Sequence, residues 1–214
     1  CRIIYINRPV SLYLVEEYMI AKDDMPLPRE GLLGELDKFI GPGATRAELI
    51  LQFGVAFVAP ILLIIYGIQS HLGWTPLQGI IACVIVLDIT GGIVTNATSS
   101  AKRWYHRPEQ GFRQHFTFIL IHFIQPLLIV IFFRSGDWAF LAVIYGYLLL
   151  ASLIILKSPL YLKRPIAMTL LIGGFVIDQY VLVSTPGLEW FIPMFYAKLL
   201  ISHLLPETPF KPDQ

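Results

Sequence analysis

The side chains with the greatest chemical potential are ionisable groups that lie inside long apolar runs. Asp88, His122, Asp178 and Lys198 each occupy such a run. An ionisable group within hydrocarbon costs on the order of 2.5–3.5 kcal/mol on insertion scales, so it needs a partner, a water-filled cavity or a function. We interpret Asp88 and His122 as a catalytic acid–base pair, and Asp178 with Lys198 as a charge pair or proton relay. A purely structural Asp–Lys clasp is the alternative.

A continuous face of small and polar side chains begins at Asp88. It comprises Asp88, Gly91, Gly92, Thr95, Asn96 and Ser99. This spacing places them on one side of an α-helix. Such a face is typical of close helix packing, and it is also suited to lining a substrate site. We predict Thr95 and Asn96 as substrate-binding residues, with a packing seam as the competing interpretation.

A basic and aromatic stretch follows, Lys102-Arg103-Trp104-Tyr105-His106-Arg107, and His115 comes soon after it. Basic groups at headgroup level are placed to hold lipid phosphates. We therefore add Arg103, His106, Arg107 and His115 to the predicted substrate-binding residues. The ordinary retention of positive charge in a cytoplasmic loop explains the same pattern.

No metal or cofactor is indicated by residue spacing. His115 and His122 are seven residues apart, about 10.5 Å along a helix, too far to share a metal through bonds of about 2.0–2.1 Å. A metal would have to draw single ligands from several helices, for example His122 with Asp88. The cysteines, Cys1 and Cys83, are too far apart in the sequence to form a CxxC site.

The composition identifies the elements that must position these residues. The chain is 56% hydrophobic and 14% charged, against about 25% charged in soluble domains. Long apolar runs match a hydrocarbon layer about 30 Å thick. The sequence predicts an all-α, polytopic membrane helix bundle of about six transmembrane helices with an N-terminal interfacial helix over residues 30–40. The predicted spans are 48–70, 76–97, 112–133, 138–156, 160–183 and 188–205.

The last predicted span is short and contains Pro193, Lys198 and His203, so a re-entrant helix is the alternative for 188–205. We divide the chain into a cytoplasmic N-terminal segment (1–47), a transmembrane domain (48–205) and a cytoplasmic tail (206–214). Residues 1–24 are either a cytoplasmic extension or the product of an alternative start site.

Lys and Arg residues predict the orientation, because they are retained on the cytoplasmic side. They gather in the N-terminal segment and in the connections near residues 102–113 and 157–164, whereas Arg134 lies in an intervening connection. Both ends are therefore predicted to be cytoplasmic, in a membrane that is most simply a bacterial cytoplasmic membrane. The net charge is only +1, and the Lys and Arg residues are not gathered on one soluble segment. The sequence therefore indicates no nucleic-acid partner.

Three functions are compatible with these residues. The leading hypothesis is an enzyme with a polar intramembrane cavity that opens to the cytoplasmic side and acts on a lipid or polyprenyl phosphate. The second is a proton-coupled transporter or channel, in which the ionisable groups relay protons. The third is an accessory subunit of a membrane complex. Membrane lipids are the expected partners, together with a second copy or another membrane subunit.

Overall fold

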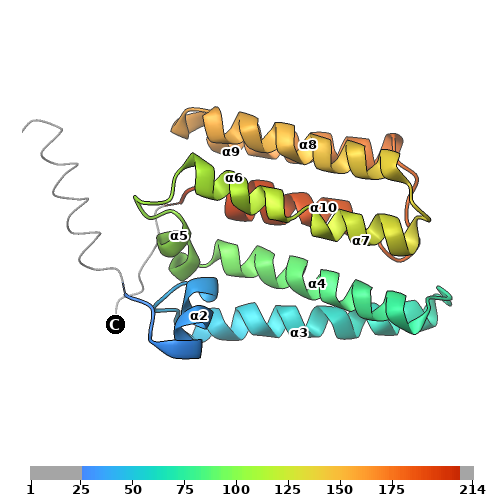
Figure 1. Ribbon diagram of the computed structural model, residues 1–214, viewed down its shortest axis with the longest axis horizontal. Helices are drawn as coiled ribbons and strands as arrows, with labels where there is room; N and C mark the ends of the chain where they lie inside the picture. The colour runs from blue at the N-terminus through green and yellow to red at the C-terminus, as the bar shows by residue number, and fades with distance from the viewer. Residues whose placement is uncertain (1–25, 208–214) are drawn as a thin grey trace, which may run out of the picture.

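The computed structural model describes residues 26–207, and every regular element within that range is a helix (Figure 1). The elements are α2 (Gly31–Ile40), α3 (Arg46–Gln69), α4 (Pro76–Ala97), α5 (Ser99–Tyr105), α6 (Phe112–Ile121), α7 (Ile124–Phe133), α8 (Trp138–Lys157), α9 (Leu160–Tyr180), α10 (Phe191–Tyr196) and the π-helix η1 (Ala197–His203). The predicted all-α class is confirmed for this range. The interpretation of residues 1–24 and most of the predicted tail lie outside it.

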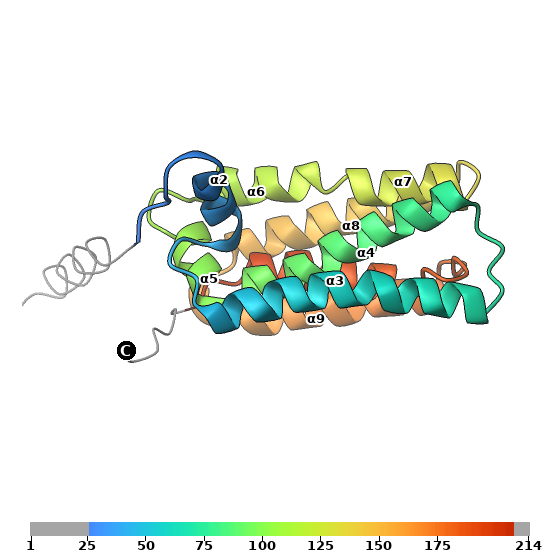
Figure 2. The ribbon, with the colours of Figure 1, turned by 90° about the horizontal axis from the view of Figure 1, so that it is seen from below.

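Five segments are long and apolar enough to cross a membrane: Arg46–Gln69, Pro76–Ala97, Phe112–Phe133, Trp138–Lys157 and Leu160–Tyr180. They lie side by side, with their axes roughly along the long axis of the molecule (Figures 1 and 2). Their outward faces carry many exposed apolar side chains, such as Ile50, Ile68 and Ile172. Lipid removes this surface from water, so the chain has the architecture of a polytopic membrane protein.

The predicted sixth span differs from the other five and is not among the candidate spans. Residues 181–190 form a connection without a long helix, and α10 and η1 have only 6 and 7 residues. At about 1.5 Å per residue these are too short to cross a layer about 30 Å thick. Tyr196, Leu199 and Leu200 are fully buried. The segment therefore runs inside the bundle, packed against α4, α8 and α9.

Helix α2 lies across one end of the bundle (Figure 2). Gly34, Asp37 and Ile40 are its buried residues, and the helix contacts α5. The opposite face carries exposed apolar side chains, namely Leu32, Leu33, Leu36 and Phe39. An apolar face at the end of a membrane bundle is typical of a helix that lies in the interface plane, and that position stays a prediction for α2.

Side-chain contacts hold α2 and the short helix α5 together. The Tyr105 hydroxyl donates toward the backbone oxygens of Phe39 and Lys38, at 2.9 and 3.1 Å. At Gly41, where φ is +88°, a Cβ atom would lie 2.3 Å from the Ser100 carbonyl carbon, so only glycine fits there.

The Arg29 guanidinium hydrogen-bonds Asp37 and lowers the pKa of that carboxyl to about 2.

The two ends of the described chain lie at the same end of the bundle. The Lys102 ammonium donates to the backbone oxygens of Ser202 and Leu205, both at 2.6 Å, and so caps the end of η1. Arg164 forms an ion pair with Glu207 at 2.9 Å. Burial lowers the pKa of Lys102 to about 8. The buried α10–η1 segment thus returns the chain to the side from which α3 departs.

This topology can be tested by labelling single cysteines with a membrane-impermeant maleimide, after Cys1 and Cys83 are changed to serine. We expect Ser158→Cys and Glu207→Cys to react from one side of sealed vesicles, because α5, the start of α9 and the end of η1 share one end. Tyr180→Cys and Gln69→Cys should react from the other side. Reaction of Glu207→Cys together with Tyr180→Cys would contradict the described path.

Candidate functional site

An ion pair within the bundle is the centre of the candidate site. The Lys198 ammonium of η1 lies 2.7 Å from Oδ2 of Asp88 on α4. Gln125, at the start of α7, donates its side-chain amide to the same oxygen at 2.8 Å. A carboxylate only accepts hydrogen bonds, so the amide nitrogen rather than its oxygen faces Asp88. Two other elements, η1 and α7, therefore converge on the Asp88 carboxylate of α4.

The two partners of the ion pair are exposed to different degrees. The Lys198 side chain is only 3% exposed, whereas that of Asp88 is 38% exposed. Gly92, one turn beyond Asp88, makes room for the lysine: a Cβ atom there would lie 2.4 Å from Lys198 Cε. The ammonium is thus largely enclosed, and the carboxylate is the more exposed of the two partners.

The small-residue face of α4 is also a packing seam. A Cβ atom on Gly91 would lie 2.9 Å from the Ala56 Cβ of α3. The Thr95 hydroxyl, on the same face, donates to the Gln52 side chain of α3 at 3.2 Å. Packing and cavity lining, which the sequence left as alternatives, therefore occur together on this helix.

The third candidate span is broken at the level of the ion pair. Helix α6 ends at Ile121 and α7 begins at Ile124. Pro126 explains the break, because it lacks a backbone N–H and its ring blocks the carbonyl of His122, four residues earlier. His122 hydrogen-bonds the backbone oxygen of Phe118 through Nδ1 at 2.6 Å. A carbonyl only accepts, so Nδ1 carries the proton and Nε2 of the neutral ring is an acceptor.

A cavity of about 360 Å³ adjoins the ion pair and the helix break. Its polar lining residues are Asp88, Thr95, Asn96, Tyr105, His122, Gln125 and Lys198, and its apolar ones include Phe39, Phe118, Ile121 and Ile124. From Asp88 to Asn96 it follows α4 for about 12 Å. Phe39, Ile121 and Ile124 are also exposed on the outside of the bundle. The cavity therefore reaches the surface that faces lipid.

Two other predicted residues, His106 and His115, do not line this cavity but form a cluster with His203. His115 Nδ1 lies 3.3 Å from His203 Nε2, and His106 stacks on His115 with ring centroids 4.7 Å apart. Phe118 stacks on His203 and separates the cluster from His122. Burial lowers the pKa of His106 to about 3, so this ring is neutral at physiological pH.

The predicted phosphate-binding arginines have other neighbours. Arg107 lies 3.7 Å above the Trp104 ring and 3.8 Å from the Glu109 carboxylate. Arg103 interacts electrostatically with the Glu48 carboxylate. That carboxylate also accepts a hydrogen bond from the backbone N–H of Ser100 at 3.0 Å. Neither arginine is among the residues that line the cavity.

Asp178 belongs to another part of the molecule. It lines a cavity of about 380 Å³ formed with Ser184, Thr185 and Glu189, and its carboxylate accepts from Gln179 at 2.9 Å. Lys198 pairs with Asp88 instead. The geometry thus joins Lys198 to the predicted catalytic aspartate and leaves Asp178 apart from both.

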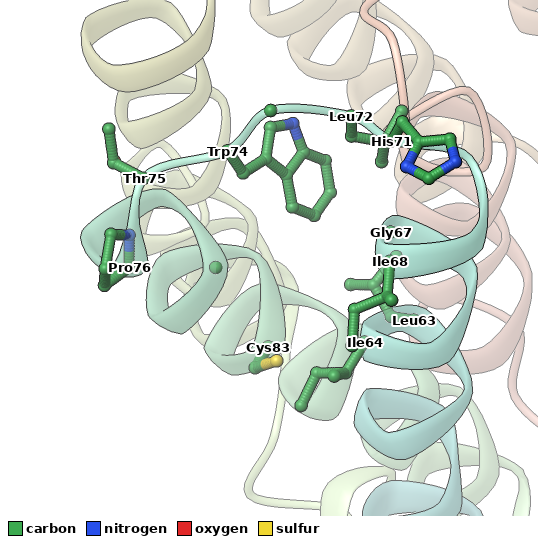
Figure 3. Close-up of a pocket in the computed structure, with 12 residues that line it drawn as sticks. Leu63, Ile64, Gly67, Ile68, His71, Leu72, Trp74, Thr75, Pro76 and Cys83 are labelled. Carbon is green, nitrogen blue, oxygen red and sulfur yellow. The ribbon is translucent and has the colours of Figure 1, made fainter.

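The groove between α3 and α4, shown in Figure 3, has a different character. It has a volume of about 510 Å³ and lies where Trp74 and His71 join the two helices. Leu63, Ile64, Ile68 and Leu72 make it largely apolar. Its ionisable lining residues are His71 and Cys83, and they come from separate elements. The chemistry therefore concentrates in the cavity beside Asp88.

Sequence reasoning missed the roles of Gln125, Gln52 and His203. Gln125 is separated from His122 by two residues, and the break at Pro126 is the signal that could have placed it at a helix start beside the site. Gln52 belongs to an otherwise apolar helix face, where an amide needs a partner.

Across residues 26–207, His, Cys, Asp and Glu form no group of three or more arranged to hold a metal ion.

The close packing of Gly92 on Lys198 gives a sharp test. Gly92→Ala would push a Cβ atom into the lysine side chain, so we expect the apparent Tm of the purified protein to fall, with an overpacking cost of about 1–3 kcal/mol. Gly79→Ala on the same helix is the matched control, because nothing lies within 4 Å of its Cβ position. Equal effects of the two substitutions would contradict the described packing.

The ion pair predicts an asymmetric double-mutant cycle. Asp88→Asn leaves the enclosed Lys198 ammonium without a counter-charge and should destabilise the fold by about 3 kcal/mol. Lys198→Met should cost less, because the Asp88 carboxylate faces a cavity. The double variant should cost clearly less than the sum of the single changes.

Unfolding in a fixed detergent or lipid mixture measures this coupling. The exposed Lys38–Glu35 pair, 2.6 Å apart, is the control, and its coupling should be within about 0.5 kcal/mol of zero. Additive effects of the Asp88 and Lys198 substitutions would rule out the described ion pair.

Comparisons with known proteins add no assignment to this geometry. No family model matches the chain, and neither a curated protein nor a solved structure matches it. The functional proposal is therefore based on the geometry of the residues around Asp88.

Proposed function

We propose that this protein is an intramembrane enzyme that binds an amphipathic lipid in the cavity beside Asp88 and acts on the lipid's polar group. One observation carries the proposal: a single cavity of about 360 Å³ combines an ion pair with apolar residues that are also exposed toward lipid. A lipid can enter such a cavity sideways, with its chain against Ile121 and Ile124 and its polar end toward Asp88.

In this proposal Asp88 and His122 act on the substrate from the same cavity rather than through each other. The exposed Asp88 carboxylate is held in its charged form by Lys198 and serves as the general base. His122 offers Nε2 as a second acceptor and exchanges a proton at that atom. Thr95 and Asn96 line the path between the interface and Asp88, where they position the polar part of the substrate.

We further propose that the end formed by α2 and α5 is cytoplasmic, because Lys and Arg gather there. On this orientation α10 and η1 act as the sixth membrane segment, enclosed by protein rather than surrounded by lipid. Both ends of the chain are then cytoplasmic, and the cavity opens near the cytoplasmic leaflet. A bacterial cytoplasmic membrane fits this arrangement.

A proton-coupled transporter is the second candidate function. The irregular helices around the ion pair support it. The α6–α7 helix is interrupted at His122, and Lys198 belongs to a π-helix, so irregular backbone flanks the ion pair on two sides. Interrupted helices around a charged midplane site are typical of transporters, and π-helical turns occur often at functional sites.

The enzyme proposal is tested in nanodiscs made from total membrane lipid. Lipid species are followed over time by mass spectrometry, for the wild type and for Asp88→Asn. We expect the wild type to convert at least one lipid and Asp88→Asn to lose turnover by a factor of about 100 or more, as loss of a general base does. An unchanged lipid profile, combined with pH-driven flux in liposomes, would favour the transporter instead.

A further inference from the structure

We propose that the cavity beside Asp88 selects an uncharged, hydroxyl-bearing polar group, as in a long-chain alcohol, and rejects the corresponding phosphate. This inference rests on the proposed function, because it names the substrate class of the same site. It depends on which hydrogen-bonding atoms the inner end of the cavity leaves unoccupied.

Three acceptors close to the ion pair are unoccupied. Oδ2 of Asp88 already receives Lys198 and Gln125, whereas Oδ1 has no hydrogen-bond partner within residues 26–207. The Gln125 amide oxygen is buried and lacks a partner among the same residues. His122, with its proton on Nδ1, presents Nε2 as a third acceptor. A buried acceptor such as Gln125 Oε1 is normally satisfied, and the other two acceptors lie beside the same cavity, so together they point to a ligand that donates hydrogen bonds.

The unequal exposure of the ion pair disfavours an anion. A phosphate that entered the cavity would meet the Asp88 carboxylate, which is 38% exposed, before the Lys198 ammonium, which is 3% exposed. Like charges brought together in this way repel one another, which suppresses binding of the wrong partner. The arginines that suit a phosphate lie outside the cavity lining.

An additional cation is disfavoured for a related reason. Asp88 and Lys198 together are neutral, so an ammonium head group would add an uncompensated charge at membrane depth, which is costly. A hydroxyl donates to Asp88 Oδ1, Gln125 Oε1 or His122 Nε2 without adding charge. The alkyl chain of the same molecule contacts Phe118, Ile121 and Ile124.

Photolabelling tests this selectivity directly on the full chain in phosphatidylcholine nanodiscs. The probes are a 16-carbon alcohol carrying a diazirine and an alkyne, and the phosphate monoester of the same alcohol. We expect the alcohol to label residues 118–125 at least about tenfold more than the phosphate, from the cost of placing two negative charges together. Excess unlabelled hexadecanol should compete with the label.

Charge removal provides the second arm. Asp88→Asn exposes the Lys198 charge without its counter-ion, so phosphate labelling should rise and the preference should shrink or reverse. If that variant does not fold, Gln125→Met keeps the ion pair and removes the unpartnered acceptor together with the amide donor to Asp88. It should reduce alcohol labelling by about three- to tenfold, the worth of one hydrogen bond, and leave phosphate labelling unchanged. Gln69→Met at the exposed end of α3 is the control.

The outcomes separate this inference from the proposed function. Stronger labelling of the same peptide by the phosphate would overturn the hydroxyl selectivity and leave a lipid-binding cavity in place. Failure of both probes to label residues 118–125 would overturn the lipid-binding proposal itself. The preference for the alcohol could also be unaffected by both Asp88→Asn and Gln125→Met. That result would show that these residues do not determine which polar group binds, and it would overturn the inference.

Discussion

An ammonium and a carboxylate lie 2.7 Å apart within an apolar bundle, and much of the structure serves to keep them there. Neither charge is stable alone at membrane depth, so the two helices that carry them must meet at one level. Gly92 lets the Lys198 stem pass close to α4, and the enclosed path of α10 and η1 brings the lysine to the centre. The ion pair thus constrains which helices are neighbours and where a glycine is needed.

The same constraint creates the space beside the pair. A straight helix through residues 112–133 would keep its backbone groups paired internally. Pro126 instead breaks the helix at His122 and places Gln125 at a new helix start, where its amide reaches Asp88. The break, the ion pair and the small face of α4 together leave a cavity that is polar at its inner end and open toward lipid. This combination makes amphipathic molecules the natural ligands.

Much of the architecture could be predicted from the sequence, because lipid imposes strong rules on composition. Five of the predicted spans correspond to the five candidate spans, with small differences at their ends. Residues 188–205 were harder, since burial within protein permits a short, irregular helix that hydropathy does not distinguish from a span. Asp88, Thr95 and Asn96 line one cavity from the same helix, because helical spacing fixes which side chains share a face.

The sequence could not supply the relations between helices. Lys198 pairs with Asp88 and not with Asp178, a choice that depends on how α9 and η1 are rotated. His106 and His115 join His203 behind Phe118, so the predicted single pocket divides into a cavity and a histidine cluster. Depth in the membrane can be counted along a sequence, whereas rotation about a helix axis is decided by packing against partners that lie far along the chain.

The most direct test of this account is a solid-state NMR distance measurement between the Lys198 side-chain nitrogen and the Asp88 carboxyl carbon. Protein labelled with 15N-lysine and 13C-aspartate at Cγ, reconstituted in lipid, should show one strongly dipolar-coupled Lys–Asp pair that disappears in Asp88→Asn. Among residues 26–207, Lys198 and Asp88 form the Lys–Asp ion pair that produces this signal. Absence of the coupling, or its persistence in Asp88→Asn, would contradict the central claim.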